Sequence, residues 1–357
     1  MQKLLKKFYK NKRVLITGNT GFKGAWLTLI LENFGAKIMG YSISELDRPN
    51  IFNLLKIKER IKFIKGDIRD FNKLKTELNK FKPEIIIHLA AQSLVKESFK
   101  SPLYTVSTNV MGSANILEYS RNSSSLKSLI YVTTDKCYEN NEWVWGYREN
   151  DKIGGFDPYS ASKAAAENLF SGYLHPYFKA KKIGAASVRA GNVIGGGDWA
   201  NDRIIPDLIR SVKNNKRLII RNPLSIRPWQ HVLEPLIGYL ILGMKLYNNH
   251  NYSGAWNFGP PSTEALSVKK VVSIFAQKLD IKKNNIIYNK PNKNDFKESK
   301  LLKINCDKAH DLLKWNSKLS AVESIDLTCD WYKNYLEKNK LNEFTISQIK
   351  NYLNKFK

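Results

Sequence analysis

The first 190 residues alternate short apolar runs with stretches of helical periodicity, and no other feature constrains the fold as strongly. The run Glu84–Ala91 (EIIIHLAA) is apolar almost throughout, as expected for a strand covered on both faces. Strands that alternate with helices build a parallel sheet with helices on either side, so we predict a doubly wound α/β fold. The other predicted strands are Arg13–Thr17, Lys37–Tyr41, Lys62–Lys65, Leu129–Thr134 and Ala185–Arg189, and the predicted helices are Ala25–Asn33, Thr105–Arg121 and Pro158–Phe178.

The second part of the chain has a looser pattern. Beyond Gly191, segments containing glycine and proline alternate with predicted helices at Ile204–Lys213 and Val268–Leu279. This pattern predicts a smaller C-terminal α/β lobe that closes over the sheet and binds the substrate. We expect a Rossmann-type domain of residues 1–190 together with about 228–256, and a substrate-binding lobe of residues 191–227 and 257–357.

A glycine-rich loop lies between the first predicted strand and the first predicted helix. The sequence TGNTGFKG spaces Gly18, Gly21 and Gly24 three residues apart. Glycine at these positions permits a tight turn and lets backbone N–H groups approach a pyrophosphate at the helix N-terminus. In this context the loop predicts a dinucleotide site, and its G-x-x-G-x-x-G spacing is typical of short-chain dehydrogenase/reductase proteins.

The identity of the dinucleotide is left open by the loop itself. The acidic residue that would bind the adenine ribose is missing after the second predicted strand, where Tyr41 and Ser42 stand. Arg48 could instead meet a 2′-phosphate, so the choice between NAD and NADP is not made here. Asp67, after the third predicted strand, is placed either to contact the adenine or to cap the next helix.

Five polar residues form the predicted catalytic group. Tyr159 and Lys163, in PYSASK, stand four apart on one helix face. The lysine ammonium and an oxidised nicotinamide should together lower the phenol pKa, so that the tyrosinate deprotonates a substrate hydroxyl. Thr134 ends the fifth predicted strand and can hydrogen-bond the same hydroxyl. Asp135 and Lys136 then offer an acid and an amine, which elimination of water requires and hydride transfer alone does not. The alternative for these two residues is a strand-end salt bridge or solvated charges.

Composition narrows the function classes. Lys+Arg 58 against Asp+Glu 32 gives a net charge of +26, which would suit nucleic acid or an anionic membrane. The basic residues are scattered, however, without the clusters and interleaved aromatics of a nucleic-acid-binding module. The longest apolar helical stretch, Pro235–Tyr247, is too short to span a membrane. Three scattered cysteines are too few for a disulfide framework or a metal site, and they indicate a reducing compartment. We therefore expect a cytoplasmic protein. Together with the scattered charge and the short apolar stretch, this predicts that the protein binds no nucleic acid, membrane or metal. His88 and His231 are predicted to be structural.

Several segments together resemble one enzyme family. TGNTGFKGAWL, HLAAQSLV, TNVMGSANILE, VTTDKCYEN, PYSASK, RAGNVIGGGDWA and IRPWQHVLEPLIGYL run in order from about Val14 to about Gly259. They are similar to the nucleotide-sugar 4,6-dehydratases of the extended short-chain dehydrogenase/reductase family. Related dehydratases usually carry Thr-Asp-Glu where this chain has Thr134-Asp135-Lys136, and Lys136 in place of the glutamate resembles the branch that acts on CDP-glucose.

The resemblance implies an NAD-dependent lyase that converts CDP-glucose to CDP-4-keto-6-deoxyglucose, in a route to the deoxysugars of a surface polysaccharide. It implies NAD contacts from Gly18, Thr20, Gly21, Phe22, Lys23, Gly24, Asp67, Ile68, Leu89, Ala90, Ala91, Asn109, Tyr159 and Lys163. It implies substrate contacts from Gln92, Asn192, Arg203, Arg221 and Arg227. Arg227 is the strongest of these, because the family's diphosphate-binding arginine falls in the RPWQH segment.

Two alternatives within the same family stay open, namely a dehydratase for another nucleotide sugar and a nucleotide-sugar epimerase. An epimerase has no elimination to catalyse, so the acid and amine at positions 135 and 136 argue against it. The nucleotide base rests on the resemblance alone. The resemblance also implies a homodimer or a dimer of dimers.

Overall fold

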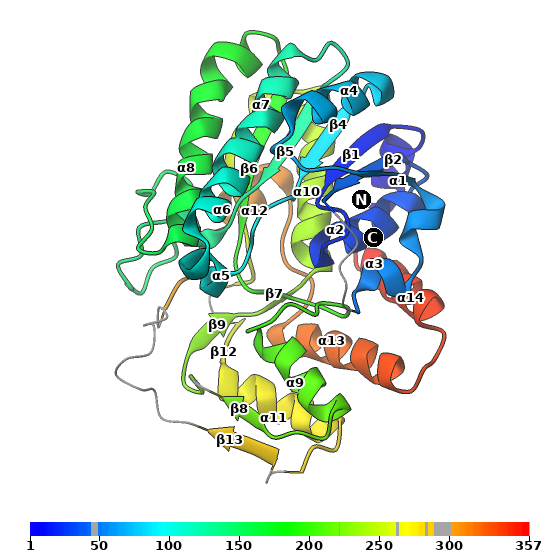
Figure 1. Ribbon diagram of the computed structural model, residues 1–357, viewed down its shortest axis with the longest axis vertical. Coiled ribbons are helices and arrows are strands. Elements are labelled where there is room, and N and C mark those ends of the chain that lie inside the picture. The colour runs from blue at the N-terminus through cyan, green and yellow to red at the C-terminus, as the bar shows by residue number, and fades with distance from the viewer. Residues whose placement is uncertain (44–48, 221, 262–263, 283–284, 289–300, 357) are drawn as a thin grey trace.

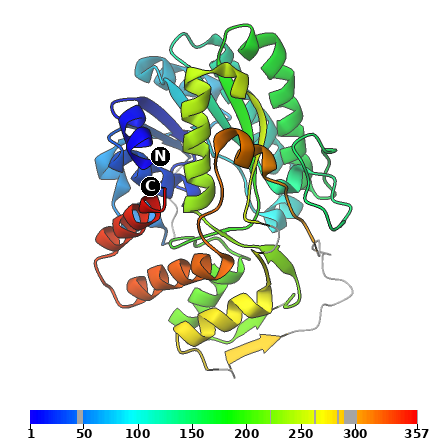
Figure 2. The same ribbon diagram turned by 180° about the vertical axis from the view of Figure 1, so that it is seen from behind.

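The computed structural model describes the whole chain except residues 44–48, 221, 262–263, 283–284, 289–300 and 357. Seven parallel strands form one sheet with helices on both faces, and a smaller lobe lies beside it (Figure 1; seen from behind in Figure 2). The predicted α/β class and doubly wound sheet are therefore confirmed. The strands are β1 (Arg13–Thr17), β2 (Lys37–Ser42), β3 (Lys62–Lys65), β4 (Ile85–His88), β5 (Ser128–Val132), β6 (Gly184–Ala190) and β11 (Gly254–Phe258).

The strand order β11–β6–β5–β4–β1–β2–β3 places the functional loops together. The chain leaves β1 toward β2 and β3 on one side and then returns to β4 on the other side of β1. The connections after β1 and β4 therefore diverge, which opens a crevice at the carboxyl ends of these strands. The glycine-rich loop follows β1 directly, and the threonine-rich turn follows β5 two strands away.

Alternate residues of the central strands enter two separate cores. Val14 and Ile16 of β1 pack in one core with α2 (Phe22–Asn33) and α10 (Leu233–Asn248). Leu15 between them packs in the other core, which holds buried residues of α4 (Phe71–Phe81), α7 (Ser113–Asn122) and α8 (Pro158–Tyr173). Because both faces of the sheet are covered, the strands are continuous apolar runs.

A buried histidine ties β1 to β4. The Nδ1 of His88 lies 2.7 Å from Thr17 Oγ1, and its Nε2 lies 2.9 Å from Ser113 Oγ. Burial lowers the pKa of His88 to about 3, so the ring is neutral at physiological pH. Burial lowers the pKa of His231 to about 3 as well. Both histidines are buried and neutral, and their structural role stays a prediction.

The smaller lobe combines helices with pairs of short strands. Its helices are α9 (Ile204–Lys213), α11 (Val268–Lys278) and α13 (Ala321–Leu336), and its strands β8 (Leu218–Ile220), β9 (Ile226–Pro228), β12 (Ala265–Ser267) and β13 (Ile286–Tyr288) pair as β8–β13 and β9–β12. Helix α14 (Leu341–Asn354) follows and brings the chain back toward its start, where the Met1 amino group donates to Phe356 O at 3.2 Å. Helix α12 (Asp307–Leu313) packs against β11, although the predicted boundaries assign its residues to the lobe.

Many elements were not predicted or differ from the prediction, among them α1 (Gln2–Tyr9), β11 and the helix predicted at Thr105–Arg121. Helix α1 was not predicted; its Tyr9 hydroxyl donates to Leu240 O at 2.8 Å, so α10 holds it in place. Strand β11 was not predicted because GAWNF is short and pairs with β6 across a long stretch of sequence. The predicted helix Thr105–Arg121 is three segments, in which the π-helix η2 (Ser107–Gly112) separates α6 (Pro102–Val106) from α7.

The remaining elements are α3 (Ile51–Leu54), η1 (Ile57–Arg60), α5 (Val95–Lys100), η3 (Asp135–Cys137), η4 (Leu174–Lys179), β7 (Val193–Ile194), β10 (Gln230–His231) and η5 (His250–Tyr252). Within the described ranges, none of the helices combines the length and apolar character that a membrane span requires.

Candidate active site

A cavity of about 1050 Å³ lies at the carboxyl edge of the sheet, between the sheet and the smaller lobe. This volume is slightly above the usual range of about 300–1,000 Å³ for a small-molecule site. Twenty of the predicted site residues line it: Gly18, Thr20, Gly21, Phe22, Lys23, Gly24, Asp67, Ile68, Leu89, Ala90, Ala91, Gln92, Thr134, Asp135, Lys136, Tyr159, Lys163, Asn192, Arg203 and Arg227. The topology thus brings residues from both parts of the chain to one cavity.

Two glycines of the loop after β1 stand where no side chain fits. Gly18 has φ +72°, and a Cβ there would lie 2.7 Å from the backbone nitrogen of Ala90. A Cβ at Gly24 would lie 2.3 Å from the Gly18 carbonyl oxygen. Gly21 is the N-cap of α2, whose first N–H groups have no partner within the helix. This backbone cradle suits the pyrophosphate of a dinucleotide.

The end of β2 supports this loop. Ser42 Oγ donates to Asn19 Oδ1 at 2.8 Å and accepts from the Thr20 N–H at 3.4 Å. Ser42 therefore orders the loop through its side chain, where many dinucleotide sites place an acidic residue. Arg48, the candidate for a 2′-phosphate, lies outside the described residues.

Asp67 lines the cavity after β3 and is paired with Arg69. Its Oδ2 lies 2.6 Å from Arg69 Nη2, and the Arg69 side chain lowers the pKa of Asp67. The alternative role of Asp67 as a helix cap is wrong, because Asp70 is the N-cap of α4 and accepts from the Lys73 N–H at 3.0 Å. Asp67 therefore lies at the cavity wall with both carboxylate oxygens hydrogen-bonded to Arg69.

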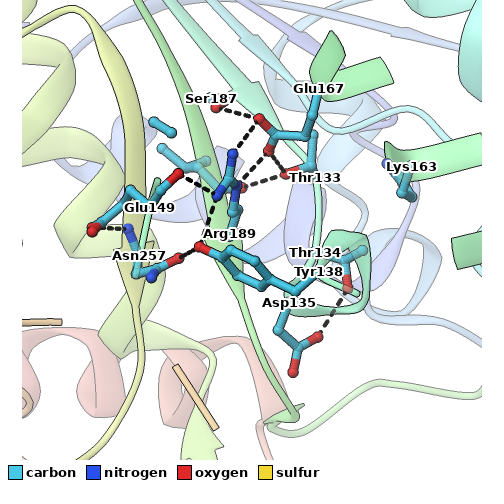
Figure 3. Close-up of polar contacts among 12 residues, drawn as sticks. Thr133, Thr134, Asp135, Tyr138, Glu149, Lys163, Glu167, Ser187, Arg189 and Asn257 are labelled. Atoms are coloured by element: carbon cyan, nitrogen blue, oxygen red, sulfur yellow. Dashed lines mark hydrogen bonds and ion pairs between the residues drawn. The ribbon is translucent and has the colours of Figure 1, made fainter. Parts of the chain in front are cut away.

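The turn after β5 carries Thr134 and Asp135, both buried (Figure 3). Thr134 is the N-cap of η3: its Oγ1 accepts from the Lys136 N–H at 3.3 Å and donates to Asp135 Oδ1 at 3.0 Å. A Cβ on Gly191 would lie 3.0 Å from Asp135 Oδ2. Glycine at position 191 therefore leaves room for the Asp135 carboxylate beside the end of β6.

Tyr159 and Lys163 enter the cavity from the first turns of α8. Asp157 caps this helix by accepting from the Ser160 N–H at 2.9 Å, with Pro158 at its first position. The cap therefore sets the helix start immediately before Tyr159. Lys163 Nζ donates to Val132 O at 3.3 Å, at the end of β5.

Burial dominates the ionisation of this pair. Burial raises the pKa of Tyr159 to about 12, although a hydrogen bond with Thr134 works against the rise. Burial also lowers the pKa of Lys163 to about 8. In the chain by itself the phenol pKa is raised, because burial disfavours the phenolate more than the neighbouring groups favour it. The predicted lowering relies on the positive charge of a bound nicotinamide as well, so it stays a prediction.

Asp135 sits among cations without a direct ion pair. Burial raises its pKa, and the positive charges of Lys136, Lys23 and Arg227 oppose this rise. Among the residues that the structure describes, no cation lies within ion-pair distance of its carboxylate, so the alternative of a strand-end salt bridge is not supported. A buried carboxyl with a raised pKa holds a proton more readily, as a general acid must.

Asn109 is placed in the scaffold rather than at the cavity. It is fully buried; its Oδ1 accepts from the Gln92 N–H at 2.8 Å, and its Nδ2 donates to Gln92 O and to Ser162 Oγ, both at 2.9 Å. It therefore links the loop after β4 to α8, which corrects its predicted contact with the cofactor. Arg221 lies outside the described residues.

Three charged residues at or near the site were not predicted from the sequence. Asp198 lines the cavity and pairs with Arg203 at 2.7 Å. Glu167 and Arg189 form a second, deeply buried pair behind the turn at Thr134. Sequence signals existed for the latter two: Glu167 is one helical turn beyond Lys163, and Arg189 is a charged residue inside an apolar strand. Over the described ranges, no cluster of three or more His, Cys, Asp or Glu side chains is placed to hold a metal ion.

The fold and the cavity residues together define a class of protein, a nucleotide-sugar dehydratase. The sequence profile of the GDP-mannose 4,6-dehydratase family matches residues 15–328, and the chain belongs to this family. At the level of individual proteins, the chain is 42% identical over 354 residues to the CDP-glucose 4,6-dehydratase of Salmonella typhimurium, with 98% of each chain covered.

Solved structures agree on the fold. The dTDP-glucose 4,6-dehydratase from Bacillus anthracis, in complex with NAD, is similar with a TM-score of 0.77 at 22% identity, over 92% of this chain and 99% of that one. The UDP-glucose 4-epimerase from Thermotoga maritima, with UDP-glucose, also has a TM-score of 0.77, at 21% identity over 91% and 99% of the two chains. Because a dehydratase and an epimerase share this fold equally, the fold alone does not choose between the two reactions.

Proposed function

We propose that the protein is an NAD-dependent CDP-glucose 4,6-dehydratase, a lyase that forms CDP-4-keto-6-deoxyglucose. The observation that carries the proposal is one cavity lined by the glycine-rich loop, by Tyr159 with Lys163, and by Asp135 with Lys136. The extensive identity to a CDP-glucose 4,6-dehydratase supports the choice of nucleotide. The alternative is a related dehydratase or epimerase acting on another nucleotide sugar. We also propose a cytoplasmic location, because nucleotide ligands of this kind are available there.

The chain's own residues suit NAD. The Gly18–Gly24 cradle and the first turn of α2 would hold the pyrophosphate, and Asp67 would lie near the adenosine. Tyr159 and Lys163 would lie at the nicotinamide end of the cavity. When bound, NAD supplies the acceptor for the C4 hydride and returns that hydride to C6.

Tyr159 acts as the base for oxidation at C4. The phenolate removes the proton of the C4 hydroxyl, which Thr134 holds by a hydrogen bond. Its raised pKa means that the phenolate needs compensating positive charge, and Lys163 is the lysine one helical turn away on α8. Loss of the hydroxyl proton and of the C4 hydride leaves the sugar as a 4-ketone. The carbonyl of this ketone makes the C5 proton acidic.

Asp135 and Lys136 carry out the elimination. Lys136, or a group that it positions, removes the C5 proton, while Asp135 donates a proton to the C6 hydroxyl, which leaves as water. The resulting C5–C6 double bond accepts hydride at C6 and a proton at C5. Arg227 and Arg203 in the lobe, with Asn192, would bind the diphosphate, because planar guanidinium groups suit phosphate oxygens.

A comparison of nucleotide sugars tests the proposal. Purified protein is incubated with the CDP-, dTDP-, UDP- and GDP-linked hexoses, and loss of water is followed by mass spectrometry. We expect CDP-glucose to give a kcat/KM about tenfold or more above the others. Higher activity on another nucleotide, or a rearranged hexose without loss of water, would support the alternative instead.

Substituting Gly24 with alanine should empty the cofactor site. The new Cβ would lie 2.3 Å from Gly18 O, so the backbone cradle must shift. We expect purified Gly24→Ala protein to retain less than about a tenth of the wild-type NAD, measured by mass spectrometry after denaturation. The matched control is Gly172→Ala in α8, where a Cβ meets nothing within 4 Å. That variant should keep its NAD and gain about 0.5–1 kcal/mol of stability; equal NAD loss in both would refute the assignment.

We also propose that two copies pair through an exposed apolar face on α6 and η2. Leu103, Val106 and Met111 are 83%, 42% and 59% exposed there. Apolar side chains grouped on adjoining helical turns favour a helix-to-helix contact with a second copy. Leu103→Lys should convert the dimer to monomer in light scattering after size exclusion, whereas Leu312→Lys on α12, with Leu312 55% exposed, should not. An unchanged dimer in Leu103→Lys would place the interface elsewhere.

A further inference from the structure

A buried ion pair between Glu167 and Arg189 lies next to the turn that carries Thr134 and Asp135 (Figure 3). Arg189 Nε lies 2.9 Å from Glu167 Oε1 and Arg189 Nη2 lies 2.9 Å from Glu167 Oε2, with both side chains 2% exposed. Ser187 Oγ also donates to Oε2, at 2.8 Å. Burying two charges is costly, and apolar residues of similar size often stabilise such a position as well or better. A contribution to folding stability therefore does not by itself explain why two charged residues occupy these positions.

The carboxylate of Glu167 holds the entry to the catalytic turn. Thr133 Oγ1 donates to Glu167 Oε1, and the Thr133 N–H donates to Val188 O at 2.9 Å. Thr133 directly precedes Thr134, the N-cap whose hydroxyl orders Asp135. The Glu167 carboxylate thus fixes the backbone at the point where strand β5 gives way to the turn.

The guanidinium of Arg189 holds the exit of the same turn. Its Nη1 donates to the Tyr138 hydroxyl at 2.7 Å and to Glu149 O at 3.0 Å. The Tyr138 hydroxyl in turn donates to Asn257 Oδ1 at 2.8 Å, on β11. Tyr138 directly follows η3, so one ion pair holds the segment that carries Thr134, Asp135 and Lys136 from both of its ends.

Glu167 also acts on Lys163 through charge. The two residues are one turn apart on α8. Burial lowers the pKa of Lys163, and the Glu167 carboxylate is the largest influence in the opposite direction. The titratable groups near Lys163 are Glu167 and Tyr159 on its own helix, Cys137 on η3, His88 on β4 and Lys23 on α2. His88 is neutral, Lys23 is a cation, and burial raises the pKa values of Tyr159 and Cys137, which leaves Glu167 as the carboxylate that supports the lysine charge.

We propose that the Glu167–Arg189 pair is a positioning device for the dehydration site, which holds the Thr133–Tyr138 turn in register and keeps Lys163 charged. This inference rests on the proposed function for its catalytic consequences. Neither residue touches substrate in this scheme, and both act through Thr134, Asp135 and Lys163.

Two substitutions test the hold on the turn while leaving the ion pair intact. Thr133→Val removes the hydroxyl that binds Glu167, and Tyr138→Phe removes the hydroxyl that binds Arg189. We expect each to lower kcat for CDP-glucose about tenfold or more while KM changes less than about threefold, because misplaced catalytic groups slow the chemistry more than binding. Thr133→Ser keeps the hydroxyl and should restore kcat.

A third substitution tests the charge. Glu167→Gln keeps the shape but removes the negative charge, so the pKa of Lys163 should fall by about one pH unit. The measurement is competitive trace acetylation of the purified protein across pH, with the Lys163 peptide quantified by mass spectrometry, and it needs no substrate. The alkaline limb of the kcat profile should move to lower pH by the same amount. Glu77→Gln, which removes a carboxylate paired with Lys80 on α4, is the matched control and should change neither quantity.

The outcomes separate this inference from the proposed function. If CDP-glucose is not dehydrated but Glu167→Gln lowers the Lys163 pKa, the proposed function fails and the charge role stands. If kcat per folded molecule, the pH profile and the Lys163 pKa all match wild type in folded variants, the inference is overturned. A lower melting temperature with unchanged kcat and pH profile would show that the pair is only structural, and would also overturn it.

Discussion

Replacing Tyr159 with phenylalanine should lower the rate of CDP-glucose dehydration about 10³-fold, because the variant has no base for the C4 hydroxyl. Thr134 and Lys163 would remain in place but neither can accept that proton as the phenolate does. Single-turnover measurements at 340 nm should show no reduced cofactor, since the first hydride transfer cannot begin. Binding of CDP-glucose, measured by calorimetry, should change little, as the lobe arginines are untouched.

Tyr177→Phe on η4 is the control for this experiment. Tyr177 is 38% exposed, and the cation–π contact with Arg121 needs only its ring. Its rate should match wild type. If Tyr159→Phe dehydrates CDP-glucose within tenfold of the wild-type rate, Tyr159 is not the base, and the assignment of the whole helix-borne pair falls with it.

Replacing Asp135 with asparagine should stop the reaction at a later stage. The carboxamide of the Asp135→Asn variant keeps the shape beside Gly191 but cannot protonate the departing C6 hydroxyl. We expect turnover to fall about 10²–10³-fold, while single-turnover absorbance at 340 nm rises and persists, because oxidation at C4 still proceeds. Lys136→Met should behave in the same way if Lys136, or a group that it positions, removes the C5 proton.

The direction of the Asp135 pKa adds a check on this role. Burial raises the pKa of Asp135, so its proton is lost at a higher pH than for an ordinary aspartic acid, and elimination should decline as pH rises through that value. Two results would contradict these separate roles of Tyr159 and Asp135. One is an Asp135→Asn protein that dehydrates CDP-glucose at the wild-type rate. The other is a folded Asp135→Asn protein that has lost both the oxidation at C4 and the elimination.

Much of the fold follows from local pattern. The apolar strands and the loop at Gly18–Gly24 predict the sheet, because parallel strands buried on both faces leave a strong sequence signal. Strand β11 left a weak signal, since its five residues include glycine and asparagine and its pairing with β6 is long-range. Helix α1 is held by a long-range contact of Tyr9 that no local pattern reveals.

The sequence motifs predicted which residues line the site, but not the buried contacts that hold those residues in place. Short spacings, such as the four residues between Tyr159 and Lys163, show which side chains share a face. The Glu167–Arg189 pair joins α8 to β6, and its role depends on hydrogen bonds to Thr133 and Tyr138. The ionisation of Tyr159 was also beyond the sequence, because burial decides it and burial is a property of the whole cavity.

The central claim is that one cavity oxidises C4, eliminates water across C5 and C6, and returns the same hydrogen to C6. The most direct test is incubation with CDP-glucose deuterated at C4, in ordinary water, with the product examined by mass spectrometry and NMR. We predict a product that has lost one H₂O and carries the deuterium at C6, without added cofactor being consumed. A product that retains all its oxygen, or one that loses water but carries no deuterium at C6, would contradict the account.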